Sequence, residues 1–504
     1  MQDDCATIPI KAVAISSTPA RWSTKPESPN EQHPRTQFTP PPWRKILPPA
    51  VGLVVLLILL ALMPDSFSTN AKITLTIFAA AVWFWIFTNI DDTYVALGAA
   101  TALATIGIIE VPELFSALGD DTMWLLIGAF IIASAVSASG LAERGALAIT
   151  KGVTSPRVLV HLVTLTIVCT VYAVPATSGR AALVIPVFLA LARTLNSEPW
   201  LTKLLSLVFP VTILFSAVGS LIGAGAHLIT NQILNTNGIE TFSFTQWLLY
   251  GLPLALASSH GAAEIILLVS STKMQRKSRI DIQPESEHTK ALSSWEIRTL
   301  LVLIIAIVLW STENLHGIHP ALVALIGGLL ITCPCFGSLS LSDAIKSIPW
   351  SLLLFMAATL ALSRALTASG AAEALANGIF GEHKSTFGGA FFIVVVVLLS
   401  SFAHLLIQSR SARSAVLIPI IIVLAPTVGV SPLAAAFIST AAAGFCHTLP
   451  ASAKPLAMFR AIEEVPVFNE QQLLRVAAFL LPLHIALCLL FAFVIWPLLG
   501  LPLF

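Results

Sequence analysis

Long apolar runs follow one another from residue 46 almost to the end of the chain, with short polar segments between them. Each run has about the 20 residues that an α-helix needs to cross the hydrocarbon core of a bilayer. The pattern predicts about eleven crossing helices, at 46–64, 71–88, 93–111, 123–140, 205–235, 246–270, 298–312, 319–337, 350–369, 432–460 and 476–499. Two further apolar segments, 157–193 and 387–428, contain polar residues in their middle and predict helical hairpins.

Tryptophans stand near many of the predicted helix ends, where interfacial residues of membrane proteins gather. They are Trp43, Trp124, Trp200, Trp247, Trp295, Trp310, Trp350 and Trp496. We therefore expect these rings to form a belt at the two surfaces of the bilayer.

Residues 1–45 differ sharply from the rest, because prolines alternate there with Ser, Thr, Gln and charged residues. Such a composition buries too little apolar surface to fold alone. The segment also lacks the apolar core of a cleavable signal peptide. We expect a disordered cytoplasmic tail.

The composition supports the membrane assignment. Of the 504 residues, 56% are hydrophobic and only 11% are charged, whereas globular domains carry about 25% charged residues. The net charge of +1 argues against a nucleic-acid partner, which would require a concentrated basic surface. The six cysteines form no paired CxxC motif of a zinc site. The sequence therefore predicts an all-α polytopic membrane protein whose main partner is the lipid bilayer.

Lysine and arginine set the predicted orientation, since they concentrate in cytoplasmic segments. They are frequent in the tail and in the polar loop 271–297, whereas 112–122 is acidic and 236–246 contains neither. We expect a multi-pass protein of the cell's inner (plasma) membrane, with its N-terminus inside and its C-terminus outside.

Two short motifs occur twice in the same order, which indicates an internal duplication. Residues Ala138–Glu143 resemble Ala368–Glu373, and Ala176–Pro186 resemble Ser409–Pro419. Five predicted crossings separate the copies, so the copies face opposite sides of the membrane. Inverted repeats are typical of transporters whose substrate site lies near the midplane.

The duplication divides the chain into four predicted parts. After the tail, residues 46–270 hold the first span and repeat one, with its hairpin at 157–193 and a broken helix at 205–235. Residues 271–297 form a cytoplasmic linker. Residues 298–500 hold repeat two, with its hairpin at 387–428 and a broken helix at 432–460.

The second helix of each hairpin begins at the hairpin tip, where its free N–H groups favour an anion. Arg180 and Arg413 lie in the first turn of these helices. An arginine within the membrane costs about 2.5–3.5 kcal/mol on insertion scales, so it normally faces a cavity or a partner. Its planar fork suits carboxylate or sulfate oxygens. Both arginines could instead anchor fully crossing hairpins at the surface, but their matched positions favour an anion site.

Glycines and prolines interrupt the helix after each hairpin, within Gly219–His227 and Gly444–Pro455. Backbone groups freed in mid-membrane are tolerated only where protein or a cavity satisfies them. His227, Ser452 and Lys454 add polar groups at these breaks. The alternatives are that His227 is a packing residue and that Lys454 extends to the inner surface.

At these tips and breaks the chain resembles the divalent anion:sodium symporter family, which carries dicarboxylates, tricarboxylates and sulfate. Ala176-Thr177-Ser178 and Ser409-Arg410-Ser411 stand at the family's Ser-Asn-Thr tips, with Pro186 and Pro419 at the expected distance. Gly223–His227 and Ala451–Pro455 stand where the family has a Gly/Thr-Pro-Pro-Asn stretch. The resemblance covers about residues 46–500.

The resemblance implies eleven spans plus two re-entrant hairpins, and an elevator in which hairpins and broken helices slide against a dimeric scaffold. The scaffold would consist of 71–140 and 246–369, and the protein would be a homodimer. Together with the anion-site argument, the resemblance gives a set of expected substrate-binding residues: Thr177, Ser178, Arg180, His227, Ser409, Arg410, Ser411, Arg413, Ser452 and Lys454.

The chain departs from the family at both tip asparagines, which Thr177 and Arg410 replace. A guanidinium beside a sodium site is repulsive by a few kcal/mol at an effective dielectric constant of about 20. We expect the second sodium site to be lost or altered, while the first could survive through Thr177, Ser178 and carbonyls near Gly223. Na⁺ is thus an expected coupling ion at one site, and no organic cofactor is expected.

The leading hypothesis is secondary active transport of a small multiply charged anion. The alternative is a proton-coupled or exchange-type antiporter of the same superfamily. An integral-membrane enzyme is disfavoured, because the chain contains no HExxH or GxSxG motif. A channel is disfavoured too, because no predicted span carries a sustained polar face.

Overall fold

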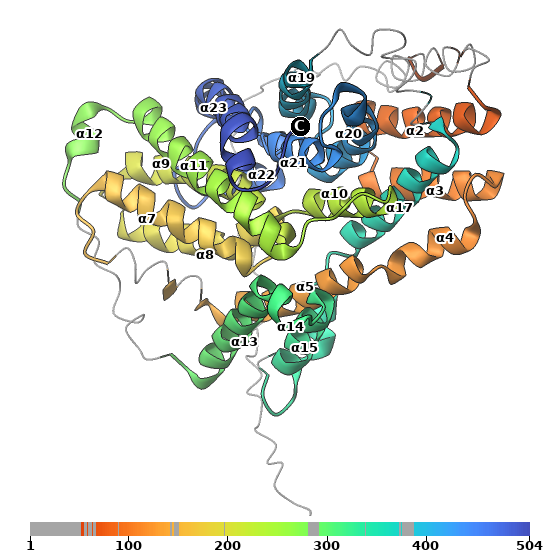
Figure 1. Ribbon diagram of the computed structural model, residues 1–504. Helices are drawn as coiled ribbons and strands as arrows, with labels where there is room; N and C mark the ends of the chain where they lie inside the picture. The colour runs from red at the N-terminus through yellow and green to blue at the C-terminus, as the bar shows by residue number, and fades with distance from the viewer. Residues whose placement is uncertain are drawn as a thin grey trace, which may run out of the picture. The chain divides into compact units, whose positions relative to one another are not determined.

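The computed structural model describes residues 52–54, 58, 63, 67–88, 90–141, 144–145, 151–195, 197–280, 292–337, 339–371, 374 and 388–504. Regular structure in these residues is entirely helical (Figure 1). The predicted tail at 1–45, most of the predicted span at 46–64 and the middle of the linker at 271–297 lie outside the described residues.

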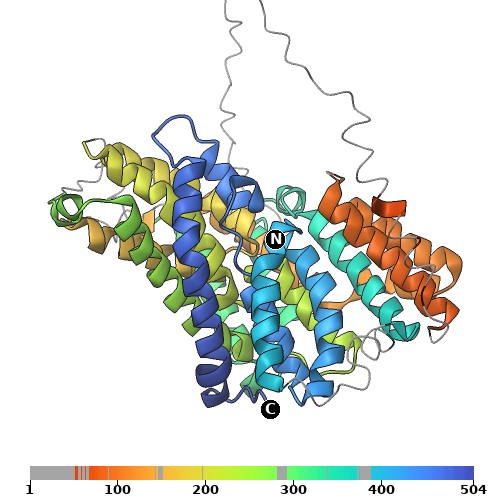
Figure 2. The same ribbon diagram turned by 90° about the horizontal axis from the view of Figure 1, so that it is seen from above.

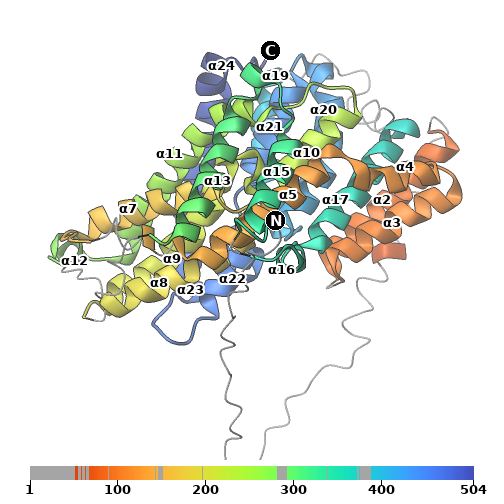
Figure 3. The same ribbon diagram turned by 90° about the horizontal axis from the view of Figure 1, so that it is seen from below.

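Six helices pair across the two halves of the chain: α2 (Thr69–Phe87), α3 (Asp92–Ile106), α5 (Asp121–Ser139), α13 (Ser294–Ser311), α15 (Pro320–Thr332) and α17 (Trp350–Ala368). Helix α5 packs along α15 (Figure 3), and α3 packs along α17 with α2 beside it (Figure 2). Helix α13 covers α15 as α2 covers α3. Each half therefore contributes a helix pair that packs on one helix of the other half.

Eight of the other helices form the hairpins and broken helices: α7 (Pro156–Cys169), α8 (Thr177–Thr194), α9 (Pro199–Ser216), α10 (Gly225–Thr236), α19 (Gly389–Phe402), α20 (Arg410–Leu424), α21 (Pro432–Ala442) and α22 (Lys454–Arg460). Two long helices, α11 (Phe244–Ser270) and α23 (Glu470–Leu490), accompany them. A π-turn at Phe491–Ile495 and α24 (Trp496–Leu498) continue α23.

The two hairpins pack in the same way. Helix α8 lies against α9 of its own half and against α22 of the other half, and α20 lies against α21 and α10. Each hairpin thus contacts the first part of the broken helix that follows it, α9 or α21. It also contacts the second part of the broken helix in the other half, α22 or α10.

Helix α11 corrects one expectation. We expected the segment 246–270 to belong to the scaffold, yet α11 packs mainly against α9, α7 and α23, with only a slight contact to α13. Helix α11 therefore supports the hairpins and broken helices.

The first repeated motif folds into the same turn in both copies. Ser139 Oγ donates to the carbonyl of Val136 and accepts from Leu141 N, while Gly140 has φ 69°. Ser369 Oγ donates to the carbonyl of Leu366 and accepts from Ala371 N, while Gly370 has φ 71°. A left-handed residue after a helix end favours glycine, which explains the Ser-Gly pair in each copy.

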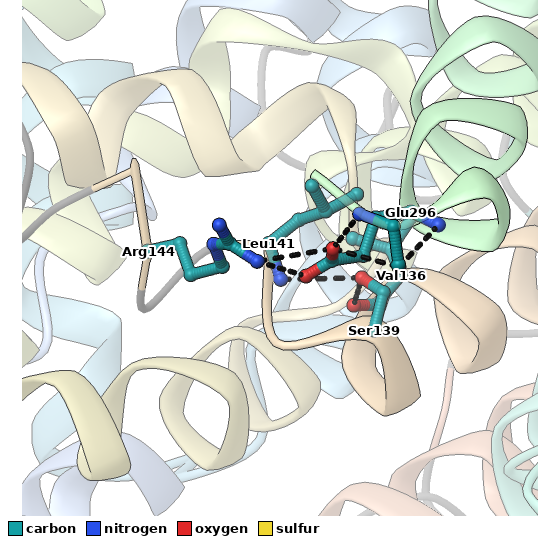
Figure 4. Close-up of polar contacts among 6 residues, drawn as sticks. Val136, Ser139, Leu141, Arg144 and Glu296 are labelled. Carbon is teal, nitrogen blue, oxygen red and sulfur yellow. Dashed lines mark hydrogen bonds and ion pairs between the residues drawn. The ribbon is translucent and has the colours of Figure 1, made fainter. Parts of the chain in front are cut away.

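An ion pair follows this turn in the first copy (Figure 4). Arg144 Nη1 donates to both carboxylate oxygens of Glu296, at 2.9 and 3.0 Å. Glu296 lies in the first turn of α13 and also accepts from Ser293 N and Ser293 Oγ, at 2.6 and 2.7 Å. The pair joins the end of α5 to the start of the second half.

Four short helices were not expected, because four to six residues carry too little periodicity to be noticed: α4 (Val111–Ser116), α12 (Lys273–Lys277), α14 (Glu313–His316) and α16 (Leu341–Lys346). Local caps define several of them. Glu110 and Glu113 form a capping box on α4, and Thr272 and Gln275 form one on α12.

Within the described part of the chain, eight helices are long and apolar enough to cross a membrane, and five shorter helices are apolar. This confirms a polytopic all-α protein, while the count of eleven spans stays a prediction. Trp247, Trp310 and Trp496 are fully buried, and their indole N–H groups donate to the carbonyls of Val218, Pro320 and Tyr250, whereas Trp124 and Trp350 are exposed. The tryptophan belt stays a prediction.

Candidate functional site

Arg180 is completely buried at the tip of the first hairpin and is held by protein groups on all sides. Its guanidinium donates to Thr170 Oγ1, to the carbonyls of Ile167 and Ile213, and to Ser216 Oγ, at 2.7 to 3.1 Å. Ile213 and Ser216 lie in the last turn of α9, where the helix breaks. Arg180 therefore satisfies carbonyls that the break leaves without helical partners.

Arg413 repeats this arrangement at the second hairpin but is only partly satisfied. Its Nη1 atom donates to the carbonyls of Ala443 and Phe445, at 2.8 and 3.0 Å, directly after the end of α21. Its Nε and Nη2 atoms are buried without a hydrogen-bond partner. Unpaired buried donors are costly, so this guanidinium is set up to receive an acceptor.

Arg410 lies between the two broken helices. Its Nη2 atom donates to the carbonyls of Leu214 and Gly444, at 3.3 and 3.0 Å, one from each half of the chain. No ion pair joins Arg180, Arg410 or Arg413 to a carboxylate in the described residues. Three positive charges thus lie close to the helix breaks without an acidic partner there.

The first tip has an unusual backbone. Ala176 has φ 69°, the sole positive φ of a non-glycine residue in the described chain. It precedes α8, whose N-terminus at Thr177 and Ser178 has no side-chain cap. At the second tip, Ser409 Oγ does cap α20, by accepting from Ala412 N.

The tips meet the breaks closely. Tyr172 donates from its hydroxyl to the carbonyl of Gly219, at 3.2 Å. A Cβ at Gly223 would lie 2.2 Å from the carbonyl oxygen of Ala217, and one at Gly225 would lie 3.1 Å from Ser411 Oγ. Gly223 has no room for a side chain, because the carbonyl of Ala217 in the same break lies against it, whereas a side chain at Gly225 would displace Leu352 and the Ser411 hydroxyl.

A small cavity lies at this junction. Arg410, His227, Ser258, Thr440 and His484 provide its polar lining. His227 is buried, with Nδ1 3.0 Å from the carbonyl of Ser220 and its ring stacked on Trp247. The cavity measures about 10 Å³, enough for about one water molecule, and it combines a guanidinium with hydroxyl and imidazole groups. A polyatomic anion would need it to widen.

The other expected residues differ in how deeply they are buried in the protein. Ser452 is buried and its hydroxyl lies 3.4 Å from that of Thr448. Lys454 is exposed at the start of α22. The structure therefore brings Arg410, Ser411 and His227 together with the helix breaks, whereas Lys454 stands apart from the cavity lining. A role for each in substrate or sodium binding stays a prediction.

Four polar residues near the breaks were missed. His404, His447 and His484 are buried around the Phe445 ring, whose centroid lies 5.0 to 5.8 Å from theirs. Asp92, at the start of α3, has the Ser409 side chain as a hydrogen-bond partner and Lys454 as a nearby cation. These residues come from separate elements, so spacing along the chain gave no sign of their proximity.

Comparison with known proteins identifies the family. The sequence model of the citrate transporter family, CitMHS, matches residues 82–442. The sodium-dependent dicarboxylate transporter SdcS of Staphylococcus saprophyticus is 24% identical over 437 residues, which cover 81% of this chain and 83% of that protein. The citrate/succinate antiporter of Escherichia coli K12 is 24% identical over 330 residues, covering 60% of this chain and 63% of the antiporter.

A solved structure shares the fold. The YdaH transporter of Alcanivorax borkumensis, which has an unusual topology, superposes with a TM-score of 0.51 at 15% identity, covering 86% of this chain and 99% of that one. The family model and these relatives identify the chain as a membrane transporter of the anion-transporting class. The chain belongs to the citrate transporter family, which confirms the resemblance to the divalent anion:sodium symporters.

Proposed function

We propose that this protein is a secondary active transporter of small di- and tricarboxylates or sulfate-like anions across the plasma membrane. The observation that carries the proposal is the group of three guanidiniums at the helix breaks without a carboxylate partner in the described chain. A multiply charged anion would supply the missing negative charge. The names of the relatives, which transport citrate, succinate or dicarboxylates, support this class.

The substrate would bind at the cavity between the second tip and the first break. Arg410 would offer its remaining N–H groups, His227 and His484 would line the opposite side, and Ser411 would border the start of α10. Arg413 would add a second cation through its unpartnered Nε and Nη2 atoms. Two guanidiniums at different positions suit a molecule with two or more carboxylates better than a monocarboxylate.

Movement would follow the elevator scheme. The hairpins, broken helices, α11 and α23 pack on one another and would move as one body against α2, α3, α5, α13, α15 and α17. The apolar outer sides of α13 and α15, which expose Leu301, Ile305, Leu322 and Leu329, would face lipid or a second copy in a homodimer. The N-terminus would be cytoplasmic and the C-terminus outside.

Arg410 also bears on which ion or substrate drives transport. Arg410 occupies carbonyls of both breaks, which removes oxygen ligands that a sodium ion would need and adds a positive charge there. We infer one sodium site at most, formed by Thr177, Ser178 and carbonyls near Gly223. The second candidate is substrate exchange, which the fixed charge of Arg410 favours because an empty cationic site is costly to move through the membrane.

Transport by the purified protein in proteoliposomes tests both. We expect uptake of radiolabelled citrate or succinate, with monocarboxylates competing poorly. An inward sodium gradient should accelerate a symporter, whereas succinate inside the vesicles should accelerate an exchanger. Absence of uptake of citrate, succinate and sulfate under every gradient would contradict the proposal.

A further inference from the structure

Four side chains connect α7 and α11 in an alternating chain near the end of α11. Arg157 and His161 lie one turn apart on α7, and His260 and Glu264 lie one turn apart on α11. Arg157 Nε donates to Glu264 Oε1 at 2.8 Å, and His161 Nε2 contacts the same oxygen at 2.5 Å. His161 Nδ1 lies 2.8 Å from His260 Nδ1, and the two rings are stacked. We name these four residues the histidine ladder.

The contact between the two Nδ1 atoms requires a defined number of protons. One nitrogen must donate and the other must accept, because two lone pairs or two N–H groups would repel at this distance. Glu264 fixes an N–H on His161 Nε2. The ladder is therefore complete with a single proton between the rings. A second proton there would set two N–H groups against each other, and protonation of both nitrogens of both rings would place two cations in contact.

Other charged groups lie on the elements packed against the ladder helices but do not bond to it. Helix α12 carries Lys273, Arg276 and Lys277, of which Arg276 donates to the carbonyls of Leu267 and Ser271. Helix α9 carries Lys203, α23 carries Glu470 and Arg475, and α13 carries Glu296 and Arg298. None of these has a hydrogen bond to the ladder among the described residues. Extra protons would therefore act mainly on the two histidines.

The ladder joins two elements that hold the candidate site. Ile167 in the last turn of α7 and Thr170, directly after the helix, provide oxygens that accept from Arg180. Helix α11 carries Trp247, which donates to the carbonyl of Val218 at the first break and stacks on His227. Separation of α7 from α11 would loosen the first hairpin from the broken helix that it contacts.

We propose that the histidine ladder is a proton-binding latch, which holds the first arm of hairpin one on α11 and releases it when both histidines are charged. His161 is 30% exposed and Glu264 is 29% exposed, so protons can reach the ladder without crossing the site. Acid on the ladder side would open the hairpin. The effect on transport rests on the proposed function, whereas the release itself does not.

Hydrogen exchange measured by mass spectrometry on the full-length protein tests the release. Histidine changes its charge between about pH 5 and 8, so exchange is compared at about pH 7.5 and 5.5, after correction for the intrinsic rate. We expect peptides from α7 to lose protection about tenfold at the lower pH, while peptides from α15 keep theirs. Citrate uptake is measured at the same two pH values.

His260→Gln is the decisive variant, because its amide oxygen accepts from a protonated His161 without adding a charge. It should keep α7 protected at both pH values. If His260→Gln does not fold, His161→Gln takes its place. His319→Gln, which alters a histidine outside the ladder, is the control and should behave like the wild type. The latch would be refuted if the protection of α7 in the wild type did not change with pH, or if it still fell at the lower pH in both glutamine variants. If α7 responds as expected and no anion is transported, the latch stands and the proposed function fails.

Discussion

Arg180 and Arg413 hold equivalent positions in the two hairpins, and each donates from Nη1 to a carbonyl at the end of the broken helix that follows. The distances are 3.0 Å to Ile213 and 2.8 Å to Ala443. The equivalence ends there. Arg180 also reaches three further oxygens, whereas Arg413 leaves Nε and Nη2 unpaired in a buried position. We therefore expect the first guanidinium to act as a structural tie, while the second has donors to spare.

Replacement of each arginine by lysine should separate these roles. Lysine concentrates its donors at one point and cannot reproduce the fork of Arg180. We expect Arg180→Lys to cost about 3–5 kcal/mol of stability, the range for breaking a buried charged network. Arg413→Lys should fold but bind citrate about tenfold more weakly. Thermal unfolding in detergent and substrate titration measure the two effects. Wild-type stability of Arg180→Lys together with lost binding would instead place Arg180 on the substrate.

Arg410 should determine the sodium response. Arg410→Asn restores the side chain that the symporter family has at this tip, frees the carbonyls of Leu214 and Gly444 and removes the positive charge. We expect uptake by this variant to depend more steeply on sodium concentration than uptake by the wild type. Arg410→Ala is the matched control, because it removes the charge without adding an oxygen ligand. An equal sodium dependence in all three proteins would refute a sodium site blocked by Arg410.

Ala176 stores strain at the first tip. A non-glycine residue at φ 69° is disfavoured by about 1–3 kcal/mol, and a β-branched side chain is worse. We expect Ala176→Gly to leave the unfolding temperature unchanged or to raise it, and Ala176→Val to lower it. Ala190→Gly, within α8, is the control and should cost about 1 kcal/mol. A loss of stability in Ala176→Gly as large as in the control would show that no strain is released.

The sequence predicted the helices well because apolar run length is a local signal. Helix α17 covers Trp350–Ala368 where 350–369 was expected, and α11 covers Phe244–Ser270 where 246–270 was expected. The interruptions between α7 and α8 and between α9 and α10 likewise fall at polar or glycine residues within apolar runs, which are conspicuous in a sequence. These features depend only on neighbours along the chain.

The sequence did not predict which residues from separate helices come into contact in the folded protein. A single histidine in an apolar helix has no periodic signal, so nothing indicated that His404, His447 and His484 surround one phenylalanine. The burial of Trp247 was missed for a related reason. Its indole N–H is needed inside, by the carbonyl of Val218 that the first break leaves free. The indole N–H of Trp247 reaches the carbonyl of Val218 only when α11 packs on the break.

The ion pair of Arg144 and Glu296 should stabilise the fold more than most surface pairs. Glu296 has only 7% of its side chain exposed and binds Arg144 through both oxygens, whereas exposed pairs contribute about 0–1 kcal/mol. Glu296→Gln keeps an acceptor for Ser293 N but loses the charge, so we expect a loss of about 1.5–3 kcal/mol. Glu296→Ala also removes the cap of α13 and should cost more.

A double-mutant cycle with Arg144→Gln isolates the pair from the cap and from any other contact that either side chain makes. Thermal unfolding of the wild type, the two single variants and the double variant gives the coupling energy. We expect a coupling energy of at least about 1 kcal/mol. Because the carboxylate is buried, the loss of stability in Glu296→Gln should be the same at low and at high salt. A coupling energy near zero would mean that the cap of α13, and not the link between the halves, accounts for the role of Glu296.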